Sequence, residues 1–108
     1  MERKLGRGDV VWLDFTPTKG HEQSGRRPAV VLSPKEYNEK SGLFLVCPVT
    51  SKIKGYPFEV QIGGKITGAI LVDQLRSVDW KERNAKYIET LPVATMAKVK
   101  RLLDLILP

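Results

Sequence analysis

Short apolar runs recur along most of the chain, each bounded by polar or turn-forming residues, which is a pattern typical of β-strands. The runs predict strands over residues 9–15, 28–33, 43–49, 58–62, 68–75 and 85–89. Residues 34–42 are polar and close with a glycine, so we expect at most a short helical turn there. Residues 79–83 predict an irregular segment or a single helical turn, and the Gly63-Gly64 pair marks a turn between strands.

The period of the apolar pattern changes near the C-terminus. Apolar residues there follow helical spacing at Met96, Val99, Leu102, Leu103 and Ile106. This spacing predicts an amphipathic helix over 96–107, with Thr90 or Thr95 as its cap. Leu105 and Leu107 widen the apolar face beyond what one small domain covers, which favours a homodimer.

Many short strands followed by one helix predict a mainly β protein. In 108 residues we expect a single domain, 1–108, with one hydrophobic core. A small, strongly bent antiparallel barrel with a C-terminal amphipathic helix fits this order, because closing a sheet on itself removes open strand edges.

Composition and charge narrow the class of protein. The formal net charge of +6 favours a polyanionic partner, either nucleic acid or an acidic protein segment. No apolar stretch approaches the roughly 18 residues that span a bilayer, and residues 1–7 lack the apolar part of a secretory signal. We therefore expect a cytoplasmic protein with no membrane contact. The single cysteine, Cys47, lies in an apolar run and is interpreted as a buried small hydrophobe.

The segment between the first two predicted strands is a candidate functional loop. It is much longer than the roughly two to five residues that a hairpin needs. Lys19, Arg26 and Arg27 bring positive charge, and the run 21–24 places histidine, glutamate, glutamine and serine side by side. A solvated surface loop is the alternative reading of the same residues.

Enzyme chemistry is limited by the motifs that the sequence lacks. One histidine excludes a mechanism with two imidazoles, and no zinc, dinucleotide, phosphate-loop or serine-hydrolase motif occurs. The remaining arginine, hydroxyl, carboxylate and imidazole groups suit phosphoryl transfer in which the substrate supplies its own nucleophile. RNA does so through its 2′-hydroxyl, and a guanidinium matches the geometry of a phosphate, so neither metal nor cofactor is expected.

Several blocks of the sequence closely resemble the MazF/PemK toxins of bacterial toxin–antitoxin systems. The blocks are 8–12, 17–23, 27–34, 48–50, 54–60 and 73–74, in family order and with family spacing. The block Gly20-x-Glu22-Gln23-x-Gly25-x-Arg27-Pro28 is the most specific of them. The resemblance extends from about residue 6 to the C-terminus.

The resemblance implies a fold, an activity and partners. The fold is a small SH3-like barrel with a terminal helix, assembled as a homodimer. The activity is sequence-specific, metal-independent cleavage of single-stranded RNA, which leaves a 2′,3′-cyclic phosphate and a 5′-hydroxyl. The partner is a cognate acidic antitoxin of the MazE-like kind, expected to fold as it covers the basic site.

The resemblance also implies the catalytic residues. Arg27 and Thr50 match the family's catalytic arginine and threonine, and Glu22 matches an acidic position that supports the active loop. His21 and Asp73 match positions implicated in the PemK branch.

Two features qualify the match to the PemK branch. That branch carries an arginine two residues before the aspartate, where this chain has Leu71, which argues for smaller roles for His21 and Asp73. Residues 54–58 are instead similar to the MazF branch. Gln74, next to the aspartate, is a further candidate for catalytic support.

Six residues are candidates for binding RNA: Lys19, Gln23, Arg26, Lys54, Tyr56 and Arg76. Tyr56 lies between a glycine and a proline and is the candidate platform for a stacked base. Trp12 and Trp80 are interpreted as core or dimer-interface residues instead. Arg27 as an ion-pair partner of Glu22, and Thr50 as an ordinary strand residue, are the structural alternatives.

Two other function classes remain open on the sequence alone. Toxins of the same fold poison DNA gyrase through an aromatic C-terminal tail. This sequence ends in Leu-Ile-Leu-Pro with no tryptophan, which argues against that class. A barrel that binds nucleic acid without cutting it is the second. The RNA sequence that is recognised depends on loop conformation, because the loops carry the contacts to the bases.

Overall fold

The computed structural model describes residues 3–15 and 25–108. Within these residues the strands are β1 (Asp9–Phe15), β2 (Gly25–Val31), β3 (Leu43–Thr50), β4 (Glu59–Gly63), β5 (Thr67–Leu71), β6 (Arg76–Asp79) and β7 (Lys86–Thr90). The helices are α1 (Lys35–Ser41), the short 3-10 helix η1 (Val72–Gln74) and α2 (Val93–Ile106).

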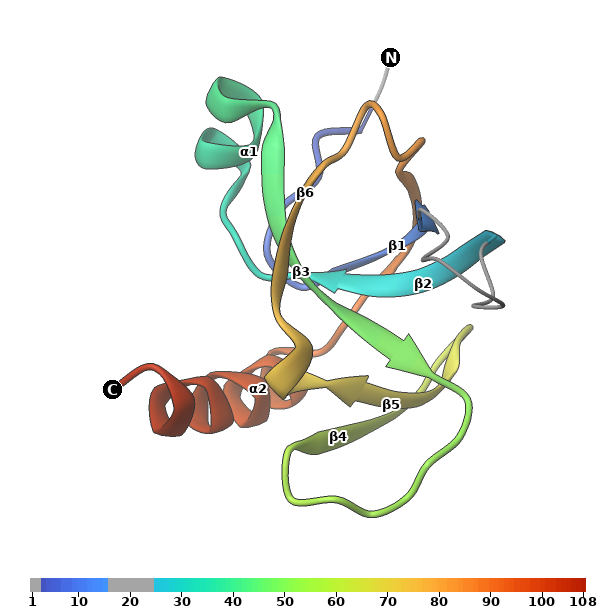
Figure 1. Ribbon diagram of the computed structural model, residues 1–108, viewed down its shortest axis with the longest axis vertical. Coiled ribbons are helices and arrows are strands. Elements are labelled where there is room, and N and C mark those ends of the chain that lie inside the picture. Colours follow the sequence, from blue (N-terminus) through green and yellow to red (C-terminus); the bar gives the residue numbers. More distant parts are fainter. Residues whose placement is uncertain (1–2, 16–24) are drawn as a thin grey trace, which may run out of the picture.

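The strands form one curled antiparallel sheet in the order β4-β5-β3-β2-β1-β7. β3 is its centre and runs from α1 down to the β4–β5 hairpin (Figure 1). One edge of β3 pairs with β2, while β6 pairs with its first half and β5 with its last two residues. The predicted class is confirmed: a mainly β, partly open barrel with a C-terminal helix.

Apolar side chains cover both faces of the central strands. Val10, Val30 and Cys47 pack with the β4–β5 hairpin and with Met96 and Val99 of α2. A second cluster lies on the other face and contains their sequence neighbours Val11, Ala29, Val31 and Val46, together with Leu13, Phe44 and Val78. Because alternate residues of a strand point to opposite faces, the continuous apolar runs are explained by burial on both sides.

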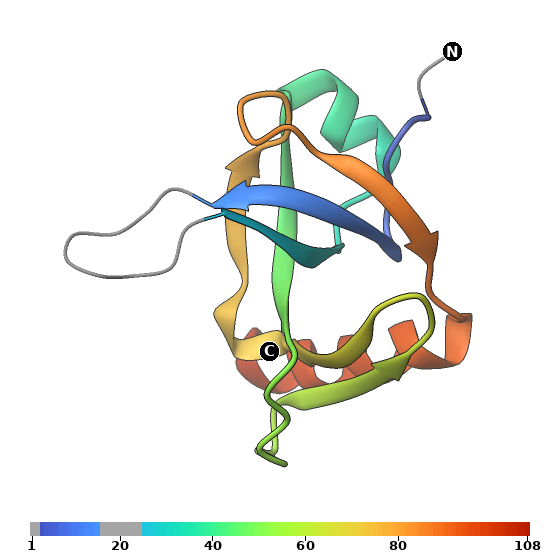
Figure 2. The same cartoon turned by 90° about the vertical axis from the view of Figure 1, so that its right-hand side faces the viewer.

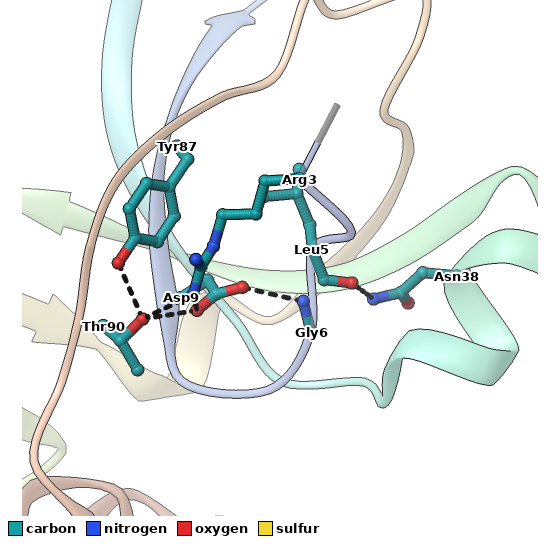
Figure 3. Close-up of polar contacts among 7 residues, drawn as sticks. All are labelled: Arg3, Leu5, Gly6, Asp9, Asn38, Tyr87 and Thr90. Carbon is teal, nitrogen blue, oxygen red and sulfur yellow. Dashed lines mark hydrogen bonds and ion pairs between the residues drawn. The ribbon is translucent and has the colours of Figure 1, made fainter. Parts of the chain in front are cut away.

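A buried carboxylate ties the N-terminal segment to β1 and β7 (Figure 3). Asp9 accepts hydrogen bonds from the backbone N–H of Gly6 at 2.9 Å and from the Thr90 hydroxyl at 2.8 Å. Arg3 lies 3.7 Å from the same carboxylate, and its guanidinium stacks 3.9 Å from the centre of the Tyr87 ring. A buried charge needs such partners, and Asp9 has three of them.

The structure corrects four expectations about elements. Residues 34–42 contain the two-turn helix α1, and β2 begins at Gly25 instead of residue 28. The strand expected over 68–75 is broken by η1 and continues as β6, whose Arg76 and Ser77 are exposed and therefore carry no apolar pattern. Helix α2 begins at Val93 after Pro92 with no side-chain cap, so neither threonine caps it, and Thr90 binds Asp9 instead.

None of the helices in the described part of the chain is both long and apolar enough to cross a membrane.

Candidate functional site

The pairing of β2 with β3 brings Arg27 and Thr50 together. Ala29 pairs with Pro48 at the end of the observed ladder. Beyond this pair, Arg27 on β2 and Thr50 on β3 follow at the same end of the two antiparallel strands. Both residues line one open hollow of about 680 Å³ at the end of these strands. Two residues 23 positions apart in the sequence thus face one space, while their roles stay predictions.

Arg27 is exposed at the hollow, and the neighbouring arginine is already bound elsewhere. Arg26 points to the opposite side of β2, as strand alternation requires. Its guanidinium donates to Asp14 at 2.7 Å and to the backbone carbonyl of Asn84 at 2.7 Å. Hydrogen bonds from Asn84 and Arg26 hold the pKa of the Asp14 carboxyl below its usual value. Among residues 3–15 and 25–108, no carboxylate forms an ion pair with Arg27.

The Thr50 hydroxyl is oriented by its own loop. Its Oγ1 accepts a hydrogen bond from the backbone N–H of Lys52 at 3.1 Å. A hydroxyl oxygen that accepts in this way keeps its proton to donate. Thr50 therefore offers a hydrogen-bond donor to the hollow that Arg27 also lines, and a hydroxyl and a guanidinium together suit the oxygens of a phosphate.

A second hollow of about 440 Å³ adjoins the first and also contains Thr50 and Lys52. Besides Thr50, its lining includes four more of the site residues predicted from the sequence, Lys54, Tyr56, Asp73 and Gln74. The Glu59 carboxylate accepts hydrogen bonds from the backbone N–H groups of Lys54 and Gly55, at 3.1 and 2.9 Å. The Tyr56 side chain is 60% exposed on this pinned loop, so its ring is available for stacking.

The other predicted residues lie elsewhere. Arg76 stacks over the Phe15 ring at 5.5 Å from its centre and lines neither hollow, like Arg26. Lys19, His21, Glu22 and Gln23 lie outside the described residues. The contributions of all six to RNA binding or catalysis stay predictions.

Sequence reasoning missed three residues that line the first hollow: Trp12, Lys52 and Lys65. Lys52 lies two residues after Thr50, so the sequence could have predicted its place at the hollow. The sequence could not predict the same for Lys65, because only the folding of the β4–β5 turn brings it there. Trp12 is 37% exposed and is not a core residue, whereas Trp80 packs on the second cluster as expected and donates its indole N–H to the Asn38 carbonyl.

Cys47 is a buried residue of the core, as the sequence predicted. Burial together with the nearby Asp73 charge raises the pKa of its thiol to about 12. The thiol is therefore protonated at neutral pH and is no nucleophile there.

Comparison with known proteins identifies the family. Residues 6–107 match the model of the PemK-like, MazF-like toxins of type II toxin–antitoxin systems. The endoribonuclease toxin MazF of Escherichia coli K12 is 45% identical over 101 residues, covering 93% of this chain and 91% of that protein. The chain belongs to this MazF/PemK family.

Solved structures of the MazF family show the same architecture. The crystal structure of MazF from Deinococcus radiodurans superposes with a TM-score of 0.88 at 46% identity and covers 98% of both chains. A MazE–MazF structure from the same organism gives a TM-score of 0.87 at 46% identity, covering 97% of each. The predicted resemblance to this toxin family is confirmed.

The placement of Thr50 in this MazF-like fold depends on a glycine of β5. A methyl group on Gly68 would overlap the backbone carbonyl of Thr50. We expect Gly68→Ala to lower the free energy of unfolding by about 1–3 kcal/mol, because one of the two backbones must move. Urea unfolding at a single protein concentration measures this change.

Gly63→Ala is the matched control, because a Cβ there meets nothing within 4 Å. Its free energy of unfolding should stay within about 0.5 kcal/mol of the wild type. In amide NMR spectra, the Gly68→Ala change should displace the Thr50 signal and the Gly63→Ala change should not. Equal stability of the two variants would show that β3 and β5 are not in this close contact.

Proposed function

We propose that this protein is a sequence-specific, metal-independent endoribonuclease that cleaves single-stranded RNA in the cytoplasm as the toxin of a toxin–antitoxin system. The observation that carries the proposal is that Arg27 and Thr50 line one open hollow together with Lys52 and Lys65. The family supports it, because its relatives from Escherichia coli carry the name endoribonuclease.

The proposed reaction uses the RNA as its own nucleophile. The 2′-oxygen attacks the adjacent phosphorus, the bond from phosphorus to the 5′-oxygen breaks, and a 2′,3′-cyclic phosphate and a 5′-hydroxyl result. The 2′-hydroxyl gives up one proton, and the leaving 5′-oxygen takes up one. Glu22 is the catalytic candidate for handling these protons, with His21, Asp73 and Gln74 as candidates for support.

Arg27 and Thr50 act on the charge that develops in this reaction. Negative charge builds up on the phosphorane oxygens, and a guanidinium placed beside them stabilises the transition state more than the substrate. The Thr50 hydroxyl, oriented by the Lys52 N–H, donates to one of the same oxygens. Lys54 and Tyr56 in the adjoining hollow bind the neighbouring nucleotides by charge and by stacking.

Substitution of these two residues tests the chemistry. Arg27→Ala should reduce the cleavage rate about 10²–10³-fold or more, because the transition state loses its cation. Thr50→Val keeps the shape of the side chain but cannot donate a hydrogen bond, and it should also slow cleavage at least tenfold. Rates are measured under single-turnover conditions on a long RNA with EDTA present.

Arg101→Ala, on the exposed side of α2, is the control and should cleave at the wild-type rate. Wild-type rates in Arg27→Ala would end its assignment, and unchanged turnover in Thr50→Val would return Thr50 to a purely structural role. Intact RNA with a mobility shift would identify a binding protein instead. If the RNA is neither cleaved nor shifted in mobility, a toxin that poisons DNA gyrase remains as the function.

We also propose a homodimer to which the apolar surplus of α2 contributes. Leu105 and Leu107 are 71% and 61% exposed in the single chain, and Val93 is exposed as well. Burial of such side chains is the usual driving force of association. Sedimentation at micromolar concentration should show twice the chain mass. A species of 12.1 kDa across that range would contradict the dimer.

A cognate antitoxin is the proposed regulator, in line with the MazE–MazF complexes of relatives. The cations around the two hollows favour an acidic segment that is partly disordered when free and folds on binding. Such a segment should compete with RNA for Arg27 and Lys54. Co-expression of a small acidic partner encoded beside this gene should rescue the growth arrest that the chain causes alone. A ternary complex with RNA still bound in the hollow would rule out the shared site.

A further inference from the structure

The turn between β4 and β5 is fastened to the opposite edge of the sheet by one side chain. Glu89 of β7 accepts hydrogen bonds from the backbone N–H groups of Lys65 at 3.1 Å and Ile66 at 3.0 Å. No backbone ladder joins β7 to β4 or β5, although the sheet curls until the turn approaches β7 (Figure 2). Glu89 therefore closes the barrel at this point through its carboxylate.

Gly64 brings the backbone of this turn close to Glu89. A methyl group on Gly64 would overlap the Glu89 carboxylate, so glycine at this position lets the backbone reach the acid. The backbone N–H of Gly64 donates to the Ile66 carbonyl at 3.2 Å, which tightens the turn further. These contacts fix the direction in which residue 65 leaves the turn.

Lys65 leaves this turn on the side of the candidate active site. It lines the same 680 Å³ hollow as Arg27 and Thr50, together with Lys52. Within the described ranges its ammonium group forms no ion pair. A cation at the rim of a site, unpaired by the residues around it, is placed to meet a phosphate of a substrate strand.

We propose that Lys65 binds an RNA phosphate next to the one that is cleaved, and that Glu89 is a positioning residue that holds Lys65 there. This inference rests on the proposed ribonuclease function and extends its site from β2 and β3 to the β4–β5 turn. Lys65 contributes to binding of the strand, while Arg27 and Thr50 act on the reacting phosphate.

The positioning role of Glu89 predicts the direction in which RNA affinity changes when this carboxylate is removed. A carboxylate near an RNA-binding surface repels phosphates, so its removal should strengthen RNA binding if charge alone mattered. If Glu89 instead holds the turn, its removal releases two backbone N–H groups and weakens RNA binding. The two interpretations therefore predict changes in affinity of opposite direction.

The experiment compares variants in RNA affinity and in cleavage. Affinity is measured by fluorescence anisotropy with an oligonucleotide that contains the site cut by the wild type and carries a 2′-hydrogen at that nucleotide. Lys65→Ala should raise the Kd about 5–10-fold and reduce the slope of log affinity against log salt by about 0.7, as for one lost phosphate contact on a single strand. Its single-turnover rate at saturating RNA should stay within about twofold of the wild type.

Lys40→Ala is the matched control, since Lys40 is an exposed lysine of α1, which lies well apart from the β4–β5 turn (Figure 1). It removes the same charge and should change the Kd less than twofold. If Lys65→Ala behaves like Lys40→Ala while the wild type cleaves RNA, the inference is wrong and the proposed function stands. If the wild type neither binds nor cleaves RNA, both fall.

Glu89→Ala should raise the Kd several-fold, and it should add little in a chain that already carries Lys65→Ala. Each Glu89 oxygen accepts from one of the two N–H groups, so Glu89→Gln keeps one of these hydrogen bonds and should recover only part of the affinity. Tighter RNA binding by Glu89→Ala, or fully additive losses in the double variant, would overturn the positioning role. Thermal unfolding of each variant separates a released turn from an unfolded protein, and the Lys65→Ala result tests the phosphate contact independently.

Discussion

The site depends on the close packing of the end of β3 against β5. Thr50 pairs with Ala69 of β5 on one side, and Arg27 of β2 lines the same hollow as Thr50. The approach of β5 is possible because Gly68 has no side chain, since a methyl group there would meet the Thr50 carbonyl. The β4–β5 hairpin thereby becomes a wall of the hollow, and its turn carries Lys65 to the same space as Arg27. Residues from three separate parts of the sequence thus line one space around the end of β3.

Charge is distributed around this frame in two different ways. Some charged groups are used in structure: Arg26 is bound to Asp14, and Asp9 binds the N-terminal segment and Thr90. Arg27, Lys52 and Lys65 line the hollow, and none of them takes part in an ion pair of the described residues. Cations that no neighbouring carboxylate neutralises are available to bind a phosphate. Glu59 and Glu89 help by binding backbone N–H groups of the two turns that frame the hollows, which leaves the lysine side chains of those turns available.

The sequence predicted the fold well where burial shapes the residue pattern. β1 was predicted with its observed bounds, and β3 within one residue, because their apolar runs pack on both faces of the sheet. The sequence did not predict β6 as a separate strand, because Arg76 and Ser77 are exposed. The predicted start of α2 was three residues too far along the chain, because its first turn has no capping side chain. Arg27 and Thr50 were reached through the resemblance to a family, since nothing in their spacing shows that they meet. Lys65 was beyond reach, because its position depends on a carboxylate 24 residues away.

The proposed cleavage uses the 2′-hydroxyl of the RNA itself as the nucleophile. Mass spectrometry of the fragment ends tests this, after digestion of a defined RNA with EDTA present, beside the same RNA with a single 2′-hydrogen at the cut nucleotide. We expect 2′,3′-cyclic phosphate and 5′-hydroxyl ends on the first RNA and no cut at that position in the second. Cleavage of the 2′-deoxy position, or fragments with 3′-hydroxyl and 5′-phosphate ends, would contradict it.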